Sequence, residues 1–334
     1  MALEDNTSAL QGTFVQLLSH HNEWTKNEWR TLFRHFESLQ LSQVIIQWSV
    51  LDNTAFYRSK SYQNTSTPPL KTILELADEY QINVLIGLAY DTKYWNSVQN
   101  NPSQLQAHFQ DFYKRSFLAA KEILPQAIQH SSFQGWYISE EIDDINWHHS
   151  DSQKILFRYL NRLTQHLHAL TPNKKIALSG FSNAALTPQE FQLFWQTLLA
   201  SADIDIVLFQ DGIGVNKLQL DNLPSYFNAM QHAATKTNTE LQAIIEIFTQ
   251  VSGSPINNKP FKAIPAPLDR VIQQLTIADQ YAQQNIAFSI PEYMTPEGGI
   301  QANQLYQNYR KNILKKFYSR VPSLEQAQLT LSKP

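Results

Sequence analysis

Short apolar runs alternate with amphipathic segments along most of the chain. Eight of the apolar runs are rich in β-branched and aromatic residues, and each has the length of a buried strand. We expect strands at residues 12–18, 43–50, 82–90, 133–143, 175–181, 204–210, 241–248 and 285–290. The pattern therefore predicts a sheet protein whose strands are separated by other elements.

Each expected strand is followed by a segment whose apolar residues recur every three or four positions, the period of one helix face. Two of these segments open on a capping box, Thr25 with Glu28 and Thr187 with Glu190, whose side chains satisfy free backbone amides. Besides the helices that begin there, we expect helices at residues 70–80, 103–123, 151–170, 223–235, 268–283 and 302–317.

Strict alternation of strands and helices predicts right-handed crossovers and a parallel sheet. Eight such units close naturally into a (β/α)₈ barrel, with an open doubly wound sheet as the alternative. We expect one barrel domain over residues 1–334, with a loosely held tail after about residue 321. The long loops follow the strands, so they gather at the carboxyl end of the barrel, where this fold carries its chemistry.

Composition excludes several classes of function. The formal net charge is −3 and the 26 basic residues are scattered, which argues against binding of nucleic acid or anionic membranes. There is no Cys, so thiolate chemistry and disulfides are excluded. No run approaches the roughly 18 apolar residues of a membrane span.

The first twelve residues lack the basic start and apolar run of a signal peptide. We expect either a cytoplasmic protein, or a periplasmic or secreted one whose signal has been removed. The sequence alone leaves both open.

Acidic residues cluster where the strand at residues 133–143 ends, namely Glu140, Glu141, Asp143 and Asp144. Carboxylates packed this closely repel one another and resist burial, so a purely structural strand seldom ends this way. Adjacent strand residues point to opposite sides, so only one of Glu140 and Glu141 can face the barrel mouth. The residues by themselves barely separate the two.

A second isolated acid, Glu246, interrupts the apolar strand at residues 241–248 near its carboxyl end. Glu141 and Glu246 would converge across the barrel opening. Glycoside hydrolysis requires such a pair, with one acid protonating the leaving oxygen and the other attacking the anomeric carbon or activating water. The alternative is a structural ion pair with Lys or Arg.

Further polar and aromatic residues lie at strand ends and in the loops beyond them. We expect Tyr94, Trp95 and Trp147 to be sugar platforms and Glu292 to be a third candidate acid. The glycines at 212 and 214 are expected to aim Gln210 and Asp211 into the mouth. The full set of expected substrate contacts is Gln16, Gln47, Tyr90, Tyr94, Trp95, Glu140, Trp147, Asn183, Gln210, Asp211 and Glu292.

Two histidine pairs, 20–21 and 148–149, lack the helical spacing of metal ligands, and no metal motif is present. We therefore expect no metal and no cofactor, and a carbohydrate as the partner.

With these residues in view, the chain resembles the DUF4434 family of glycoside-hydrolase-like (β/α)₈ proteins. The resemblance spans residues 12–14, 24–29, 90–95, 135–142, 209–212 and 293–296, together with the strand that contains Glu246. It implies that the strand-four acid is Glu141, with Glu140 where relatives often carry Gln. More distantly, the two acids resemble those of the large clan of retaining glycosidases. That clan usually has Asn where this chain has Glu140, and relatives tend to have Glu where this chain has Ser289.

Two functions follow. The first is a retaining glycoside hydrolase that cleaves a polysaccharide or oligosaccharide, with Glu141 as acid/base and Glu246 as nucleophile. The second is a non-catalytic carbohydrate-binding barrel that assists exopolysaccharide assembly or export.

Overall fold

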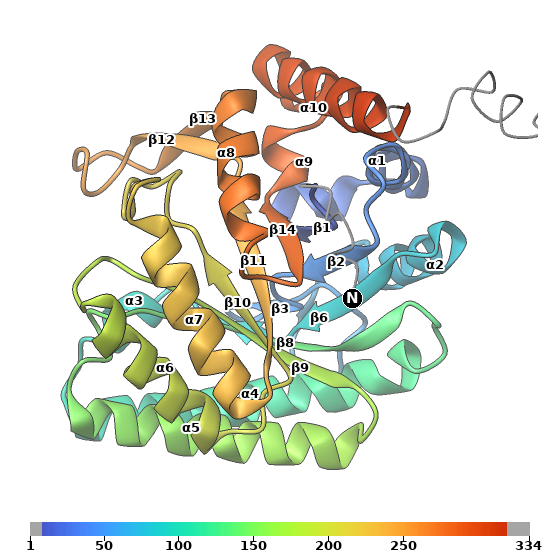
Figure 1. Ribbon diagram of the computed structural model, residues 1–334. Helices are drawn as coiled ribbons and strands as arrows, with labels where there is room; N and C mark the ends of the chain where they lie inside the picture. The colour runs from blue at the N-terminus through green and yellow to red at the C-terminus, as the bar shows by residue number, and fades with distance from the viewer. Residues whose placement is uncertain (1–8, 319–334) are drawn as a thin grey trace, which may run out of the picture.

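Eight parallel strands form a closed barrel in a computed structural model that describes residues 9–318 (Figure 1). Around the ring, the order is β1-β14-β11-β10-β9-β8-β6-β2. The strands are β1 (Gly12–Val15), β2 (Gln43–Ile46), β6 (Asn83–Gly87), β8 (Phe133–Ile142), β9 (Lys175–Phe181), β10 (Ile206–Gln210), β11 (Glu240–Glu246) and β14 (Gln284–Phe288). Closure comes from the pairing of Gly12 with Ile286 and of Thr13 with Ala287. The predicted (β/α)₈ barrel is confirmed.

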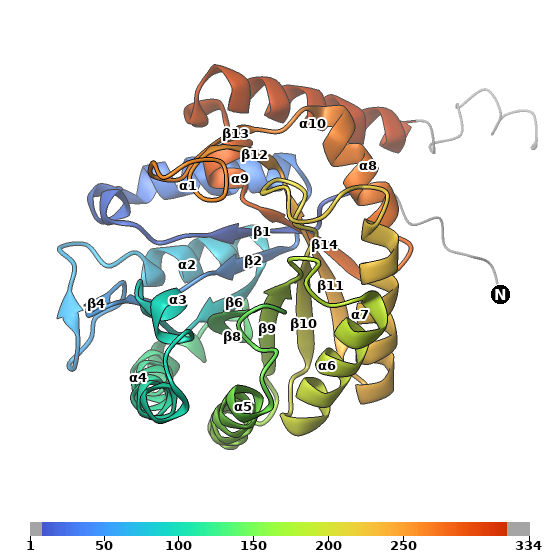
Figure 2. The same ribbon diagram turned by 90° about the vertical axis from the view of Figure 1, so that its left-hand side faces the viewer.

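Helices follow the strands and cover the outside of the barrel (Figure 2). The main ones are α1 (Lys26–Ser38), α2 (Leu70–Tyr80), α4 (Pro102–Ala127), α5 (Ser150–Leu170), α6 (Pro188–Ser201), α7 (Leu223–Thr237), α8 (Leu268–Ala278) and α10 (Ile300–Tyr318). Both predicted capping boxes form. The backbone N–H of Thr25 donates to Glu28 at 2.6 Å, and that of Thr187 donates to Glu190 at 2.9 Å.

Short elements occupy parts of the expected loops, and several also take the ends of expected strands, at residues 50, 89–90, 248 and 290. In the segments that follow β2 and β6, the chain becomes extended again, and short pairs of residues form a small separate sheet. These pairs are β3 (Val50–Leu51), β4 (Thr54–Ala55), β5 (Gln63–Asn64) and β7 (Ala89–Tyr90). The loop after β11 is a hairpin of β12 (Phe248–Ser252) and β13 (Lys262–Pro265). The remaining short elements are η1 (Ser19–Glu23), α3 (Tyr94–Ser97), α9 (Ile290–Tyr293) and η2 (Pro296–Gly298).

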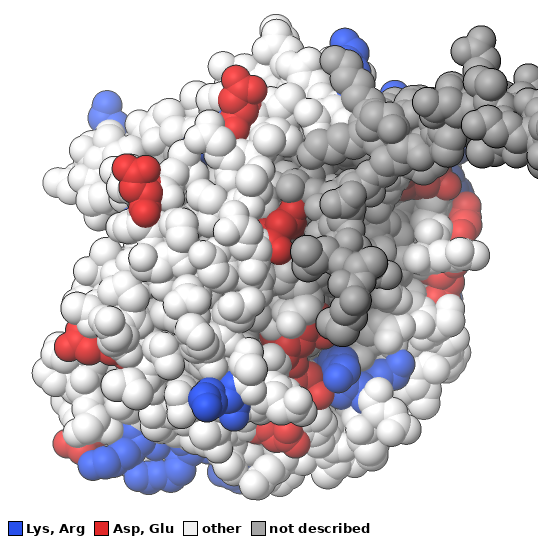
Figure 3. All heavy atoms as spheres, viewed as in Figure 1, with Lys and Arg blue, Asp and Glu red and all other residues white. Residues whose placement is uncertain are grey.

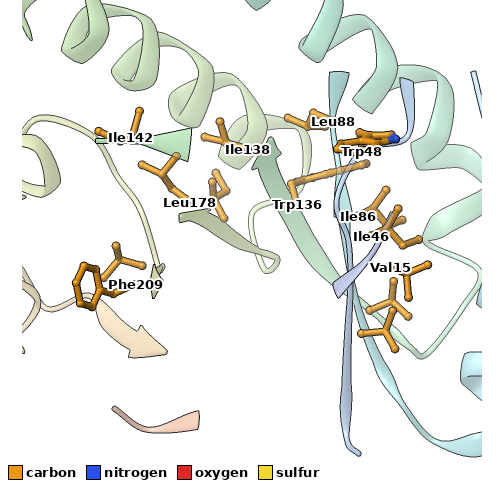
Figure 4. Packing of buried hydrophobic residues seen from close by; sticks show 14 of the residues in the cluster. Val15, Ile46, Trp48, Ile86, Leu88, Trp136, Ile138, Ile142, Leu178 and Phe209 are labelled. Carbon is orange, nitrogen blue, oxygen red and sulfur yellow. The ribbon is translucent and has the colours of Figure 1, made fainter. Parts of the chain in front are cut away.

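Alternation along the strands divides the core into two parts. One set of side chains fills the barrel interior, and it comprises Phe14, Ile45, Leu85, Tyr137, Ala177, Ile206, Leu208, Ile244 and Ile286. The opposite faces pack against the helices, as Trp136, Ile138 and Phe209 do in Figure 4. Side chains that lie an even number of residues apart on a strand share a face, which we call the same parity. The parity of an acid relative to the interior residues therefore indicates whether it faces the mouth.

Both ends of the described chain lie against the same part of the barrel. The Leu10 backbone N–H donates to the Tyr309 hydroxyl at 2.7 Å, so the segment before β1 is tied to α10. The tail expected to be loose after residue 321 lies outside the described residues.

Lys, Arg, Asp and Glu are interspersed over the face drawn in Figure 3, in keeping with the small net charge. Across residues 9–318, no helix is long and apolar enough to cross a membrane.

Leu208→Ala should lower the free energy of unfolding by about 2–5 kcal/mol, because it opens a void inside the barrel. Leu193→Ala is the control, since this α6 side chain is 61% exposed and its loss should cost less than about 0.5 kcal/mol. Urea unfolding followed by circular dichroism measures both. Equal costs would contradict the assignment of Leu208 to a packed interior.

Candidate active site

Three polar side chains continue the interior faces of their strands at the carboxyl end of the barrel. Glu141 shares the parity of Tyr137 on β8, Gln210 that of Leu208 on β10, and Glu246 that of Ile244 on β11. The strands pair in register, Gln210 with Ile244 and Glu246 with Phe288. Both predicted catalytic acids therefore point to the barrel axis at the same end.

Glu141 is held by neighbours on two other segments. Its Oε1 accepts a hydrogen bond from Gln210 Nε2 at 2.7 Å, and its backbone carbonyl accepts one from the Tyr94 hydroxyl at 2.8 Å. Burial raises the pKa of the carboxyl, while Lys217 and Gln210 oppose the rise. The site thus favours a proton on Glu141 more than water does.

Glu246 is only 4% exposed, and its Oε2 accepts a hydrogen bond from the Val215 backbone N–H at 3.0 Å. A β-carbon at Gly214 would lie 2.9 Å from the same oxygen, so the close approach of this loop requires glycine. Burial, and then the negative charge of Asp211, raise the pKa of Glu246 to about 8. Both effects favour the protonated form of this carboxyl.

Lys217 brings a positive charge to the same mouth, from the loop between β10 and α7. Its Nζ lies 3.3 Å from the centroid of the Phe181 ring at the end of β9. Burial lowers the pKa of this ammonium group, and the charges of Glu141 and Glu246 raise it. Within the described chain, neither glutamate forms a salt bridge, so the structural ion-pair alternative lacks support.

Glu140 points away from the mouth, which corrects the expectation that it contacts substrate. It has the parity of Trp136 and Ile138 and is 1% exposed. Its Oε1 accepts a hydrogen bond from the Tyr159 hydroxyl of α5 at 2.5 Å, while its Oε2 has no partner among the described residues. Burial raises its pKa to about 8.

Asp211 also turns outward, so the expectation that the glycine turn aims it into the mouth is wrong. Its carboxylate accepts hydrogen bonds from Gln274 of α8 and from the Ile213 backbone N–H. Burial raises its pKa to about 6. Gln210, one residue earlier, takes the interior position instead because successive strand residues alternate.

Asp143 and Asp144 tie the loop after β8 to the loop after β9. Asp144 accepts from the Ser182 hydroxyl at 2.7 Å and from the Asn183 backbone N–H at 2.8 Å. The Asn183 side-chain amide donates to Asp143 and Asp144, at 3.1 and 3.2 Å. Asn183, an expected substrate contact, is therefore engaged in this cross-link.

The expected aromatic platforms divide into buried and partly exposed residues. Tyr94 and Trp147 are 0% exposed, so neither can stack on a sugar, and the expectation for them is wrong. Trp95 is partly exposed and contacts the Phe181 ring at 5.7 Å between centroids. Tyr90 is also partly exposed and stacks on Trp48 at 5.2 Å.

The remaining expected contacts lie on the other half of the ring. Gln16 and Gln47 continue the interior faces of β1 and β2, and Gln16 Nε2 donates to Gln47 Oε1 at 2.6 Å. Glu292, on α9, accepts a hydrogen bond from the Ser289 hydroxyl. It stands beside a separate cavity between α1 and α9.

Sequence reasoning missed Lys217, Phe181 and the Val215 amide as parts of this mouth. Phe181 could have been found, because it ends a strand and has the parity of the interior residue Ala177. Lys217 lies in an irregular loop, where no periodicity signals its direction.

The acidic and histidine side chains of the described residues do not gather into a metal site. Among residues 9–318, no group of three or more His, Asp or Glu side chains is positioned to hold a metal ion.

Glu140→Gln should stabilise the protein increasingly as pH rises. A buried carboxyl whose pKa rises from 4.5 to about 8 on folding holds its proton in the folded state, so folding loses stability between those pH values. The amide removes this loss and keeps an oxygen for Tyr159. Thermal melts should show a larger gain in Tm over the parent at pH 8.5 than at pH 4.5. The same gain at both pH values would contradict the raised pKa.

Three solved structures named as glycoside hydrolases are similar to this chain. A protein from Bacteroides thetaiotaomicron, provisionally named as an α-L-fucosidase, superimposes with a TM-score of 0.75 at 21% identity, over 93% of this chain and 95% of its own. The endo-β-1,4-mannanase of Thermotoga petrophila gives 0.55 at 12% identity, over 93% and 78%. That of Rhizomucor miehei gives 0.54 at 15% identity, over 94% and 97%. These structures share the (β/α)₈ barrel fold with this chain.

Relatives at the level of sequence include the uncharacterized protein YbcH of Escherichia coli K12, which is 22% identical over 297 residues. The match covers 87% of this chain and 93% of the relative. The profile of a domain of unknown function, DUF4434, matches residues 10–299. The chain belongs to the DUF4434 family.

Proposed function

We propose that the protein is a glycoside hydrolase that cleaves a polysaccharide or oligosaccharide with Glu141 and Glu246. The observation that carries the proposal is that one segment contacts both carboxyls. Gln210, at the end of β10, donates to Glu141, and Val215, in the loop that follows, donates to Glu246. Two acids from strands separated by β9 and β10 thus flank the same short segment at the mouth.

The surroundings of Glu141 suit a general acid/base. Its pKa is raised by burial, so it can hold a proton for the departing glycosidic oxygen, and Gln210 fixes the orientation of the carboxyl. After the leaving group departs, the resulting carboxylate can take a proton from the attacking water.

Glu246 is proposed as the nucleophile, which attacks the anomeric carbon and forms a covalent glycosyl ester that water then hydrolyses with retention. Attack requires the carboxylate. The Val215 N–H and the charge of Lys217 favour that form, whereas burial and Asp211 oppose it. A pKa of about 8 therefore predicts faster attack at mildly alkaline pH.

A carbohydrate-binding barrel without turnover is the competing proposal. The support for it is that burial and the charge of Asp211 favour the protonated form of Glu246, which is unfavourable for attack. Both proposals predict carbohydrate binding, and only the first predicts cleavage that depends on the two acids.

Glu141→Gln and Glu246→Gln should each lower kcat/KM by a factor of about 10² or more, because each removes a proton donor or a nucleophile. Glu140→Gln is the matched control: its side chain is one residue away but faces α5, and turnover should remain within about twofold of the parent. Reducing ends released from a panel of bacterial polysaccharides provide the readout. Unchanged turnover in both mouth variants would remove the mechanism.

A substrate with a 2,4-dinitrophenyl leaving group should separate the two roles. Such a leaving group needs no proton, so Glu141→Gln should still release dinitrophenolate while Glu246→Gln should not. The rate in Glu141→Gln should rise with pH up to about 8, as the Glu246 carboxyl loses its proton. Release by Glu246→Gln but not by Glu141→Gln would mean that the roles are exchanged.

A further inference from the structure

A cavity of about 550 Å³ lies outside the mouth, between η1 and α1 on one side and α9 and η2 on the other. Figures 1 and 2 both draw α9 beside α1. Its main lining residues are His21, Trp24, Leu32, Pro291, Glu292 and Glu297. Neither Glu141 nor Glu246 lines it, so it is distinct from the proposed catalytic pair.

His21 lines this cavity, and a hydrogen bond to the backbone fixes the orientation of its ring. The side chain is 2% exposed, and its Nδ1 accepts a hydrogen bond from the Leu18 backbone N–H at 3.0 Å. Burial, and then the charge of His20, lower its pKa to about 3, so the ring is neutral and Nε2 carries the hydrogen. The contact that holds the ring therefore uses Nδ1 and does not consume the Nε2–H donor.

Trp24 supplies an apolar platform beside that donor. It is partly exposed and is braced by Trp29 and His21, whose ring centroids lie 4.8 and 4.6 Å away. Leu32 and Pro291 extend the apolar wall. A rigid aromatic face with a few polar groups nearby suits a compact ligand that has both C–H faces and hydroxyl groups.

The charges around the cavity restrict the ligand further. Glu28, Glu292 and Glu297 line it, and no Lys or Arg does among the described lining residues. The pKa of Glu28 is lowered by hydrogen bonds from Thr25, so this carboxylate keeps its charge. Burial raises the pKa of Glu292, so repulsion of a ligand with a carboxylate or sulfate rests on Glu28 and Glu297. A neutral or amine-bearing ligand would not be repelled.

Tyr293 of α9 directly follows the cavity residue Glu292 in the chain. Its ring stacks on Phe248 at 5.1 Å, two residues after Glu246 in the chain. Burial, and then the charges of Glu292 and Glu246, raise the pKa of Tyr293 to about 12, so both acids act on the same phenol. A chain of sugars that extends from Glu246 past Tyr293 would therefore approach the side of the cavity that α9 forms.

We propose that this cavity binds one sugar residue that carries no acidic group, as a second contact for the chain held between Glu141 and Glu246. The link to a cleaved chain depends on the proposed function, whereas sugar binding by the cavity does not.

The test is calorimetry on the Glu246→Gln background, where turnover cannot deplete the ligand. The probes are mannotriose, xylotriose, a glucosamine trimer and trigalacturonic acid. At least one uncharged or amine-bearing trimer should bind more tightly than trigalacturonic acid. Trp24→Ala should weaken that binding at least about tenfold by removing the platform.

A second variant guards against misfolding of the first. Thr31→Trp leaves Trp24 in place and fills the cavity, and it should weaken binding to a similar degree. Ile128→Ala is the control, because this 61% exposed side chain follows α4 outside the cavity, and its loss should change affinity less than twofold.

The proposal is overturned if Trp24→Ala and Thr31→Trp bind like their background, if trigalacturonic acid binds best, or if no trimer binds. These outcomes are separable from failure of the proposed function. If the parent cleaves its substrate and neither cavity variant changes KM, only the second-site proposal is wrong. If a trimer binds in a way that depends on Trp24 and the parent cleaves nothing, only the hydrolase proposal is wrong.

Discussion

The alternation of side chains along strands of a closed barrel is the constraint on which this site depends. Tyr137 and Ile244 belong to the packed interior, and Glu246 follows from the alternation along β11. The register of β8 shifts between Ile138 and Ile142, and the bond from Gln210 shows that Glu141 still reaches the mouth. A shift of either strand by one residue would exchange Glu141 for Glu140 or turn Glu246 outward. The apolar interior thus fixes which of the neighbouring acids can act together.

Neutral hydrogen-bond donors orient the carboxyls at this mouth more than counter-ions do. Glu141 has an amide donor from Gln210, and Glu246 has a backbone N–H from Val215. Lys217 is near enough to act on both, yet within the described chain it forms a salt bridge with neither. Because a close ion pair would hold both acids ionised, its absence among the described residues leaves one of them able to carry a proton.

Much of the architecture could be predicted from local signals. The bounds of α2 and β9 match the predicted ranges, and both capping boxes form, because helix period and capping depend on residues close together in the chain. The pair of Glu141 and Glu246 could be predicted as candidates because each acid interrupts an apolar strand end. Parity then separates Glu141 from Glu140 once the interior residues are known.

The loops were less accessible to sequence reasoning. Trp147 has polar neighbours in the chain, yet it packs against Phe109 of α4, and such a contact between distant segments leaves no local pattern. Asp211 shows the same limitation, since its partner Gln274 lies on a helix far along the chain. Lys217 enters the mouth through a turn whose course depends on the close approach of Gly214 to Glu246.

Closure of the ring has a consequence for how the polypeptide is made. The first strand, β1, pairs with β2 on one side and with β14 on the other, and β14 is the last barrel strand in the chain. On the ribosome, one edge of β1 stays open until residues 284–288 have emerged. An unpaired strand edge is a template for wrong association. Nascent chains of this protein therefore pass through a long interval in which they depend on protection from neighbouring polypeptides.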